Sequence, residues 1–475
     1  MNKIKFGTDG WRAVIAKEYT FNNLKKVACA TALWIRKENI TKNGVIIGYD
    51  ARFLSREFAE HAATVFASME VPVRISDSIV PTPAVSWAAK HFDAVGIAIT
   101  ASHNPPEYNG FKIKAPYGGS AGPEHISAVE AQLDEVDDAP LTKSYEDFLK
   151  AGLIRELGLG KGYLEKVAEN VDLDAIRKSG IRIAHDPMYG AGSGYIKRLL
   201  GDQVYEIHSE RNPLFGGRAP EPVEENLSEL AALIPKNNCH IGIANDGDAD
   251  RITMLDENGQ FVSSHLILSL LVKYLYTEKK MSGTIVKTFS TTDMLNKQAK
   301  KYGLPIEITP IGFKYVAHKI IEGDVLAGGE ESGGLAVKGH LPERDGIYIG
   351  LLIAEMMVKS GKKLSELVQE LFDEFGPHHY YRNDILTENR KKEAMSAFCR
   401  GKHLTEIAGL KVSEWDFTDG VKHIMEDESW LLVRQSGTEP VLRIYSEAPS
   451  REQAERLVNA VSRKVDDPII LSVNV

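Results

Sequence analysis

The sequence predicts an α/β protein of three consecutive α/β/α domains with mostly parallel or mixed sheets, followed by a smaller C-terminal α+β domain. A pattern that occurs three times supports this: a β-branched run, a polar loop, a helical segment and a second apolar run. This order is typical of a right-handed βαβ unit on a parallel sheet. The length of 475 residues fits three or four domains of ordinary size. The pattern stops after Phe375-Gly376-Pro377.

Each repeat is predicted from its own residues. The strand, helix and second strand are expected over 44–50, 58–66 and 71–75 in the first repeat, over 181–186, 195–200 and 204–207 in the second, and over 284–288, 293–302 and 305–308 in the third. A further apolar strand follows in each repeat, over 94–99, 240–244 and 324–327, and each runs into a polar loop. Because ligands in open α/β sheets lie beyond the carboxyl ends of strands, we expect the three loops to face a shared central cleft.

The C-terminal part has a different pattern. Short strands are expected over 430–434 and 441–446, and a helix is expected after Ser450, with Gln453 three residues later in the spacing of a capping box. We therefore expect four domains. Their predicted limits are 1–156, 157–257, 258–374 and 375–475.

The composition excludes several classes of protein. Hydrophobic residues make up 43% and charged residues 26%, which is ordinary for a folded chain, and the net charge of −9 does not favour nucleic acid or anionic lipid as partners. The longest apolar runs, 266–272 and 347–354, are shorter than the roughly 20 residues that span a bilayer, and the N-terminus has no signal-peptide pattern. Cys29, Cys239 and Cys399 form no CxxC pair, which argues against a disulfide scaffold or a zinc site. We expect a cytoplasmic protein without a nucleic-acid or membrane partner.

Three aspartates occupy alternate positions in the loop after the second repeat's last strand: Asp246, Asp248 and Asp250. Alternate carboxylates in a glycine-containing loop can converge on a hard cation, and so few protein oxygens favour Mg²⁺. An EF-hand is disfavoured because its sixth position is Arg251 rather than glycine and a strand precedes it. A dehalogenase-type nucleophile would have Thr or Val in place of Asp250. The remaining alternative is a solvated acidic turn, in which the carboxylates would repel one another.

Ser102 lies in the loop that ends the first repeat, Thr100–Pro105. A serine in a loop often caps a helix, and the glycines of a hydrolase G-x-S-x-G elbow are absent. The serine loop alone is therefore ambiguous. Beside a magnesium loop, a serine oxygen that carries phosphate would supply a further oxygen ligand.

The loop between the two C-terminal strands contains Ser436-Gly437-Thr438, with Arg434 before it and Arg443 after it. Arginine, hydroxyls and backbone N–H groups together suit a phosphate dianion. The alternative is a hairpin turn with an exposed arginine.

The loop of the third repeat places Glu330 and Ser332 two residues apart between glycines. These side chains are able to accept and donate hydrogen bonds to neighbouring sugar hydroxyls, although acidic glycine loops are common. Taken alone, Lys112, Arg12 and His340 are expected to be surface charges.

Together these segments resemble the signature loops of the α-D-phosphohexomutases, in the same order and spacing over essentially the whole chain. The matching segments are Thr100–Pro105, Asp246–Arg251, Gly329–Gly333 and Arg434–Pro440, with Gly7–Arg12 and Tyr108–Lys112 as additional matches. The resemblance implies a phosphoglucomutase or phosphomannomutase, monomeric or homodimeric, with three α/β/α domains and a smaller fourth around one cleft.

The resemblance also implies a role for each matching residue. The implied roles are Ser102 as the phosphoserine and a metal ligand; Asp246, Asp248 and Asp250 as Mg²⁺ ligands; Glu330 and Ser332 as sugar-binding residues; Arg434, Ser436, Gly437 and Thr438 as the clamp for the non-reacting phosphate; Arg12 and Lys112 as basic residues near the phosphoserine, with Lys112 assisting proton transfer; and Arg251 and His103 flanking the same site. The implied cofactor is Mg²⁺, with hexose 1,6-bisphosphate as activator.

The implied reaction is reversible phosphoryl transfer between C1 and C6 of a hexose phosphate through a bisphosphate. Gly333-Gly334 departs from bacterial phosphomannomutases and phosphoglucosamine mutases, which usually have histidine after the glycine. This weakens the hypothesis of a phosphoglucosamine mutase and leaves the choice of sugar open. Gly437 replaces the asparagine of some branches, which matters little if backbone N–H groups bind the phosphate. The alternatives are a Mg²⁺-dependent sugar phosphatase, a phosphoglucosamine mutase and a sugar-phosphate binding protein on the same scaffold.

Overall fold

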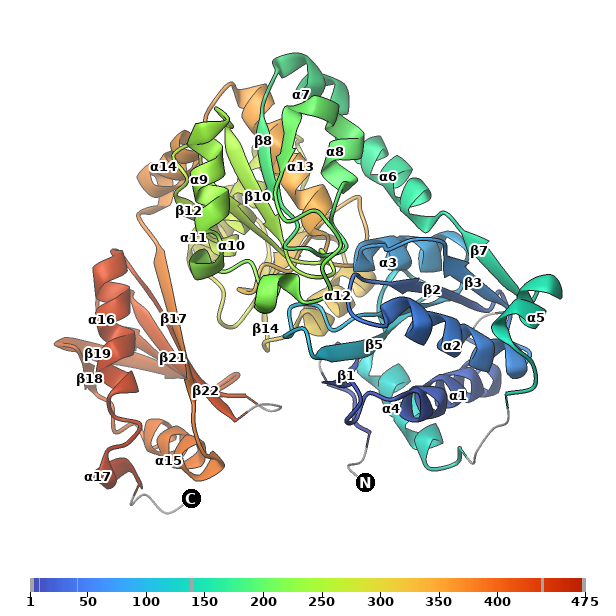
Figure 1. The fold of residues 1–475 in the computed structure, drawn as a ribbon. Coiled ribbons are helices and arrows are strands. Elements are labelled where there is room, and N and C mark those ends of the chain that lie inside the picture. The colour runs from blue at the N-terminus through green and yellow to red at the C-terminus, as the bar shows by residue number, and fades with distance from the viewer. Residues whose placement is uncertain (1–3, 8, 41, 137–140, 437–439, 472–475) are drawn as a thin grey trace. The chain divides into compact units, whose positions relative to one another are not determined.

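The computed structural model describes residues 4–7, 9–40, 42–136, 141–436 and 440–471 (Figure 1). The chain divides into two compact units. One contains Met1–Thr284 and Gly312–Leu367, and the other contains Ile285–Ile311 and Val368–Val475. The boundary between the units runs through the third repeat, and each unit is described by itself below.

The first repeat forms a mixed sheet with helices on both faces. Its strands are β1 Trp11–Val14, β2 Val45–Tyr49, β3 Val73–Ser76, β4 Val95–Ile99, β5 Tyr108–Ala115, β6 Gly119–Ser120 and β7 Ile154–Leu157. Its helices are α1 Phe21–Lys37, α2 Ser55–Ser68, α3 Thr82–His91, α4 Pro123–Leu133 and α5 Tyr145–Lys150. The strand order is β1-β5-β4-β2-β3-β7, with β6 beside β5, and β2, β3, β4 and β7 run parallel. Figure 1 shows α3 on one face of this sheet and α1 and α2 on the other.

The second repeat forms a five-stranded sheet in the order β12-β11-β10-β8-β9. Its strands are β8 Ile183–Asp186, β9 Val204–Glu206, β10 Ile241–Asn245, β11 Ile252–Leu255 and β12 Phe261–Val262. Its helices are α6 Leu159–Asn170, α7 Leu173–Ser179, α8 Tyr195–Leu200 and α9 Ser228–Lys236, with the 3₁₀ turns Gly201–Gln203, Phe215–Gly217 and Glu224–Asn226. Strands β8, β9 and β10 are parallel, and β11 returns antiparallel to β10.

The third repeat contributes elements to both units. Its strands are β13 Thr284–Thr288, β14 Ile306–Thr309, β15 Val325–Gly329 and β16 Leu335–Val337, and its helices are α10 Ser264–Thr277, α11 Met294–Tyr302, α12 Phe313–Glu322, α13 Gly346–Ser360 and α14 Leu364–Phe375. Strands β13 and β14 pair in parallel, whereas β15 and β16 pair antiparallel. The long apolar runs noted in the sequence lie in α10 and α13, whose side chains are mostly buried.

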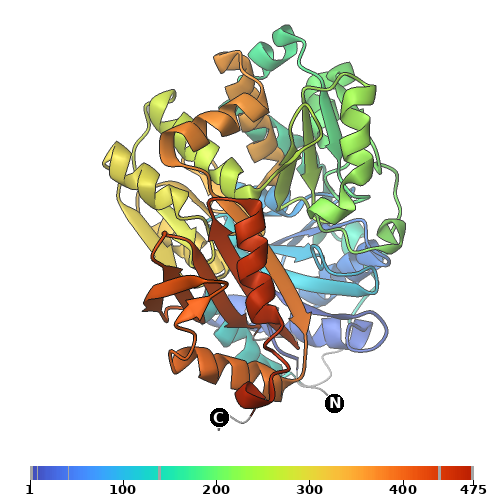
Figure 2. The same cartoon turned by 90° about the vertical axis from the view of Figure 1, so that its left-hand side faces the viewer.

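The C-terminal residues form a six-stranded antiparallel sheet in the order β17-β22-β21-β20-β19-β18. Its strands are β17 His379–Leu386, β18 Glu406–Ile407, β19 Leu410–Asp416, β20 Val421–Met425, β21 Trp430–Gln435 and β22 Val441–Ala448, and its helices are α15 Asn389–Arg400, α16 Arg451–Ser462 and α17 Pro468–Leu471. Figure 2 shows α16 lying across this sheet.

The predicted fold class is confirmed, because each predicted strand–helix–strand repeat contains a parallel strand pair. One local prediction was only half right. Ser450 Oγ accepts from the N–H of Gln453 and caps α16, but the Gln453 side chain donates to Asp427 Oδ2 at 2.7 Å rather than reaching back as a capping box requires. The domain limits proposed from the sequence remain predictions. Cys29, Cys239 and Cys399 are buried free thiols. Of the helices described, none has the length and apolar character needed to cross a membrane.

Candidate active site

Three of the predicted loops leave the carboxyl ends of buried strands. Ser102 follows β4, the aspartate loop joins β10 to β11, and Glu330 directly follows β15. The structure brings the three loops together through side-chain contacts. Ser102 Oγ lies 2.6 Å from Asp246 Oδ2, and Arg344 binds both Asp250 Oδ2 at 2.6 Å and Glu330 Oε1 at 3.2 Å. The expectation that these strand ends share one site is therefore met by direct contacts.

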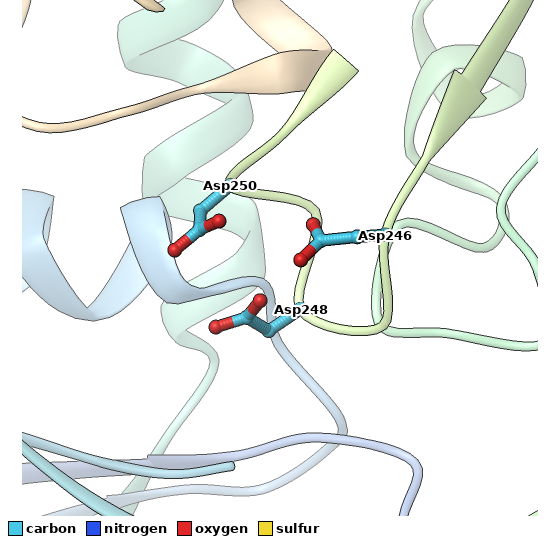
Figure 3. A group of neighbouring side chains, drawn as sticks. All are labelled: Asp246, Asp248 and Asp250. Atoms are coloured by element: carbon cyan, nitrogen blue, oxygen red, sulfur yellow. The ribbon is translucent and has the colours of Figure 1, made fainter. Parts of the chain in front are cut away.

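The three aspartates form a buried cluster. Asp246, Asp248 and Asp250 are each 0% exposed, and their nearest carboxylate oxygens all lie within 4.8 Å of one another. Figure 3 shows the carboxylates turned toward a common point from one loop. Burial and the repulsion of Asp250 and Asp248 raise the pKa of Asp246 well above its usual value. This mutual repulsion is what a cation between the carboxylates would relieve.

The hydrogen bonds of the cluster show that its residues fit a metal ion. Asp248 Oδ1 and Asp250 Oδ1 are buried and accept no hydrogen bond from the described residues. A buried carboxylate oxygen without a hydrogen-bond partner costs free energy, because the charged group has lost water without gaining another partner. Oxygen ligands from alternate carboxylates are those that a hard divalent cation prefers. These two unpartnered oxygens therefore support the interpretation of the aspartate cluster as a metal site.

The other oxygens of these carboxylates are held by buried cations. Lys112 Nζ lies 2.8 Å from Asp248 Oδ2, 3.1 Å from Asp250 Oδ2 and 2.9 Å from Asp9 Oδ2. Burial alone would lower the pKa of Lys112, but the three carboxylates outweigh it and raise the pKa above its usual value. Arg344 donates to the same oxygens of Asp250 and Asp9. One oxygen of Asp248 and of Asp250 is thus fixed by cations while the other remains available to a ligand.

The Ser102 backbone is held in an unusual conformation. Its φ is +54°, in the left-handed region that non-glycine residues rarely adopt. The Ser102 N–H donates to Thr100 Oγ1 at 2.9 Å, and Thr100 in turn donates to Asp50 Oδ2 at 2.6 Å. This chain of hydrogen bonds stabilises the strained turn and directs the Ser102 hydroxyl toward Asp246.

A single buried guanidinium holds the rest of the serine loop. Arg52 is 0% exposed and pairs with Asp50 through Nε. Its terminal nitrogens donate to four backbone carbonyls, those of Ser102 at 2.6 Å, Asn104 at 2.6 Å, Pro105 at 2.8 Å and Tyr108 at 3.0 Å. The serine loop is therefore built around the planar donor set of one arginine.

The serine and aspartate loops touch backbone to backbone. A Cβ atom added at Gly247 would lie 2.5 Å from the carbonyl oxygen of Ser102 and 2.9 Å from Pro220 Cγ. Both separations are shorter than real contacts allow, so only glycine permits this approach.

Two further basic residues and one histidine surround Ser102. Arg12 donates to Asn104 Oδ1 at 2.8 Å, and Arg251 pairs with Glu221 at 3.5 Å. Burial, together with the positive charges of Arg251 and Arg12, lowers the pKa of His103 well below its usual value. His103 is therefore neutral at physiological pH, and the positive charge near Ser102 comes from the lysine and the arginines.

The loop that contains Glu330 is tied to the aspartate loop. Gly334 forms an isolated antiparallel bridge with Arg251, and the Glu330 N–H donates to the Gly334 carbonyl at 3.1 Å. Burial raises the pKa of Glu330, while Arg344 and Arg251 oppose this effect. Ser332 lies half-buried in the same turn.

The fourth predicted loop belongs to the second compact unit. Arg434, near the end of β21, donates from Nε to Asp419 Oδ1 at 2.9 Å. The Ser436 N–H donates to the Val441 carbonyl at 3.0 Å, and Lys392 Nζ donates to the Ser436 carbonyl at 3.4 Å. Two predicted clamp residues, Gly437 and Thr438, lie outside the described residues.

Comparison with known protein families matches four consecutive parts of the chain. The phosphoglucomutase/phosphomannomutase models for α/β/α domains I, II and III match residues 3–140, 161–259 and 263–375, and the model for the C-terminal domain matches residues 386–464. The chain belongs to the phosphoglucomutase/phosphomannomutase family. It is therefore a phosphohexomutase, an isomerase of the α-D-phosphohexomutase family.

Individual relatives cover nearly the whole phosphohexomutase. A phosphoglucomutase/phosphomannomutase of Thermococcus kodakarensis is 35% identical over 94% of this chain and 95% of its own length. A phosphoglucosamine/phosphogalactosamine mutase of Sulfurisphaera tokodaii is 29% identical over 97% of this chain and 99% of its own. A crystal structure from Thermus thermophilus, of a protein proposed to be a phosphomannomutase, is 34% identical and superposes with a TM-score of 0.86 over 98% of this chain and 99% of that one.

Three charged residues of the phosphohexomutase site were not singled out from the sequence. Asp9 lies inside the Gly7–Arg12 segment, and Arg52 follows the first buried strand, so both positions carried a signal that was not used. Arg344 lies in the loop between β16 and α13, and its local sequence carries no indication of the contacts it makes.

The default expectation of surface charges was wrong for two residues. Lys112 is 0% exposed, because it extends from β5 into the carboxylate cluster. The His340 side chain is 2% exposed and lies 2.7 Å from Asp345 Oδ2. Arg12 keeps 20% of its side chain exposed.

Proposed function

We propose that this phosphohexomutase transfers a phosphoryl group reversibly between C1 and C6 of a hexose phosphate, through phosphorylated Ser102 and a hexose 1,6-bisphosphate. One observation carries the proposal: the Ser102 hydroxyl lies 2.6 Å from Asp246 in a carboxylate cluster with two unpartnered oxygens. A phosphoryl group on this hydroxyl would meet the metal-binding carboxylates and the surrounding cations together.

The aspartates Asp246, Asp248 and Asp250 are proposed to hold Mg²⁺. When bound, this ion supplies positive charge that offsets the negative charge on the transferring phosphoryl group. Side chains of the protein supply the other charges around the phosphoryl group. Lys112 remains an ammonium among its three carboxylates, so we assign it to the stabilisation of negative charge rather than to proton removal. Arg12, Arg251 and neutral His103 are proposed to line the phosphate position.

The chemical steps conserve phosphate and protons. In the first step a sugar hydroxyl oxygen bonds to phosphorus as the bond from phosphorus to Ser102 Oγ breaks, and the proton released by the sugar hydroxyl is taken up by the departing Ser102 oxygen. The bisphosphate then reverses its orientation. In the second step Ser102 Oγ gives up its proton as it attacks the other phosphorus, and the sugar oxygen that loses this phosphorus takes up a proton. Glu330 and Ser332 are proposed to hold sugar hydroxyls during both steps, while Arg434 and the Ser436–Thr438 loop clamp the phosphate that is not reacting.

Replacement of Ser102 tests the role of this residue. Ser102→Ala should lose mutase activity by at least about a thousandfold, because the phosphoryl acceptor is gone. Intact-mass measurement should find one phosphoryl group on the wild-type protein after incubation with bisphosphate, and none on the variant. A matched control is Ser446→Ala, which removes a buried hydroxyl of the C-terminal sheet that bonds the Ala454 carbonyl. Near-normal activity in Ser102→Ala would contradict the proposal.

The substrate we propose is glucose 1-phosphate or mannose 1-phosphate, in line with the relative from Thermococcus kodakarensis. The amino-sugar phosphate is a second candidate, because the relative from Sulfurisphaera tokodaii is named for it. Measuring kcat/KM for the 1-phosphates of glucose, mannose and glucosamine, each with its bisphosphate, ranks the three. Release of inorganic phosphate faster than isomer formation would favour the sugar phosphatase instead. A binding protein would show neither activity.

The remaining expectations concern where the enzyme works and with what. A cytoplasmic location, the absence of nucleic-acid or membrane partners, and a monomer or homodimer remain predictions from the sequence. Light scattering of the purified protein measures the oligomeric state directly.

A further inference from the structure

A row of three polar side chains crosses the second sheet beneath the aspartate loop. His185 lies on β8, with Glu206 at the end of the edge strand β9 on one side and Asn245 at the end of β10 on the other. His185 Nδ1 lies 2.9 Å from Glu206 Oε1, and His185 Nε2 lies 3.0 Å from Asn245 Oδ1. The His185 side chain is 0% exposed, so both contacts are shielded from bulk water.

The donors and acceptors of the row determine where its hydrogens lie. An ionised carboxylate only accepts, so the Glu206 contact requires a hydrogen on Nδ1. Asn245 Nδ2 donates to the Arg251 carbonyl at 2.9 Å, which fixes the amide orientation and turns Oδ1 toward His185. The reversed amide would set its oxygen against the Arg251 carbonyl oxygen, with no hydrogen between them. The second contact therefore requires a hydrogen on Nε2 as well.

We propose that His185 is an imidazolium, with hydrogen on both ring nitrogens, and acts as a positioning residue for the aspartate loop through Asn245. Its positive charge pairs with Glu206, which also accepts from the Gly194 N–H at 3.1 Å. Burial would raise the pKa of Glu206, but hydrogen bonding to His185 and the charge of Lys197 on α8 lower it overall.

The three polar side chains can position the aspartate loop because Asn245, one of the three, connects the two ends of that loop. Asn245 directly precedes Asp246, and Arg251 directly follows Asp250, so one amide hydrogen bond spans the loop beside the backbone ladder of β10 and β11. A Cβ atom added at Gly346 would lie 2.4 Å from Asn245 Nδ2 and 2.3 Å from the Arg251 carbonyl oxygen. The start of α13 therefore packs directly on this hydrogen bond. Loss of the Nε2 hydrogen would favour the reversed amide and break it.

Nitrogen-15 NMR of the full chain, labelled at histidine, tests the protonation state. At pH 7 the His185 ring should show two hydrogen-bearing nitrogens with slowly exchanging N–H protons, assigned by their loss in His185→Gln. A spectrum in which Nε2 carries no hydrogen at pH 7 would overturn the proposal. This readout does not involve the metal.

The positioning role is tested by Glu206→Gln, which keeps an acceptor for Nδ1 but removes the negative charge opposite the ring. Calorimetric titration with MgCl₂ should show about tenfold weaker binding than in the wild type, with an unchanged far-ultraviolet circular dichroism spectrum. The matched control is His208→Gln, which removes a second histidine bonded to a β8 carboxylate, Asp186. Its Mg²⁺ affinity should stay within twofold of the wild type.

The outcomes separate the two proposals. Equal Mg²⁺ affinity in folded Glu206→Gln and the wild type would overturn the positioning role. That role rests on the metal-binding function proposed above, so a wild-type protein that binds no Mg²⁺ would refute both. The NMR result would still decide the protonation of His185.

Discussion

At the scale of single residues, the serine loop depends on one arginine. Arg52 supplies hydrogen bonds that this irregular loop lacks, since its guanidinium binds the carbonyls of three loop residues and that of Tyr108 at the start of β5. Buried carbonyls without partners are costly, and Ser102 is already held at positive φ. Arg52 therefore stabilises a conformation that the chain would not adopt by itself.

Replacing this arginine tests that dependence. Arg52→Lys retains the charge but cannot reach four carbonyls from one ammonium group, so we expect a loss of about 3–5 kcal/mol in the free energy of unfolding. Urea denaturation measures it. The control Arg74→Lys replaces a half-buried arginine on β3 that bonds one carbonyl, that of Asn43, and should change stability by less than about 0.5 kcal/mol. Equal effects of the two substitutions would show that Arg52 has no special role.

The proposed phosphate clamp has its own single-residue test. Arg434→Ala should weaken binding of substrate and bisphosphate by roughly ten- to a hundredfold, because a charge-assisted pair contributes about 1.5–3 kcal/mol. Ser102 should still accept phosphate and Mg²⁺ should still bind, while bisphosphate escapes more often during turnover. The exposed Arg400→Ala serves as control. Unchanged substrate affinity with no extra escape would assign the clamp to other residues.

At the scale of elements, the approach of two loops decides whether Ser102 reaches the aspartates. Gly247 allows this approach, so Gly247→Ala should push the loops apart without altering either sheet. A displacement near 1 Å lowers phosphoryl transfer about a hundredfold. Rapid-quench measurement of transfer from phosphorylated enzyme checks it. At the control position, Gly158→Ala, the added Cβ would meet nothing closer than 3.6 Å, and the rate should be unaffected.

The C-terminal sheet contains a buried histidine that makes its stability depend on pH. Burial lowers the pKa of His423 on β20 to about 4. The unfolded chain, with a histidine pKa of about 6.5, binds the proton first, so stability is present above pH 6.5 and is lost as the pH falls toward 4. The total loss should be about 3 kcal/mol.

Hydrogen exchange of the β20 and β21 amides, corrected for intrinsic rates, measures this loss in the full chain. His423→Gln should remove most of the pH dependence, whereas His403→Gln, at an exposed position, should keep it. Retention of the full dependence in His423→Gln would assign it to other groups.

At the scale of the whole molecule, the chain divides into two compact units, and the three carboxylates proposed to bind Mg²⁺ all belong to the first. Because the folded site binds the ion and the unfolded chain does not, Mg²⁺ at a hundred times its Kd should stabilise the protein by about 2.7 kcal/mol, and chelation with EDTA should reverse the effect. Calorimetry with and without MgCl₂ measures this. An unfolding temperature that does not change with Mg²⁺ would contradict the proposed metal site.

The sequence by itself determined the repeated α/β architecture and the candidate loops. Hydrophobic periodicity indicates strands and helices because it reflects local burial, and the run from Asp246 to Asp250 places three ligands within one loop. Ligand sets that are contiguous in the chain can be recognised without knowledge of the fold. Ser102 and Glu330 can also be recognised from the sequence, because each lies in a polar loop that follows an apolar strand.

Only the tertiary structure decided which charges are buried and what they bind. Taken alone, Lys112 was expected on the surface, and the family resemblance placed it near Ser102 without giving its contacts. The structure shows its ammonium paired with Asp9, Asp248 and Asp250, and Arg344 from the loop before α13 binds Asp250 as well. The contacts of His185 likewise come from partners on two other strands. A single charged side chain carries no periodic signal, and its protonation and contacts depend on groups that folding brings together from distant parts of the chain.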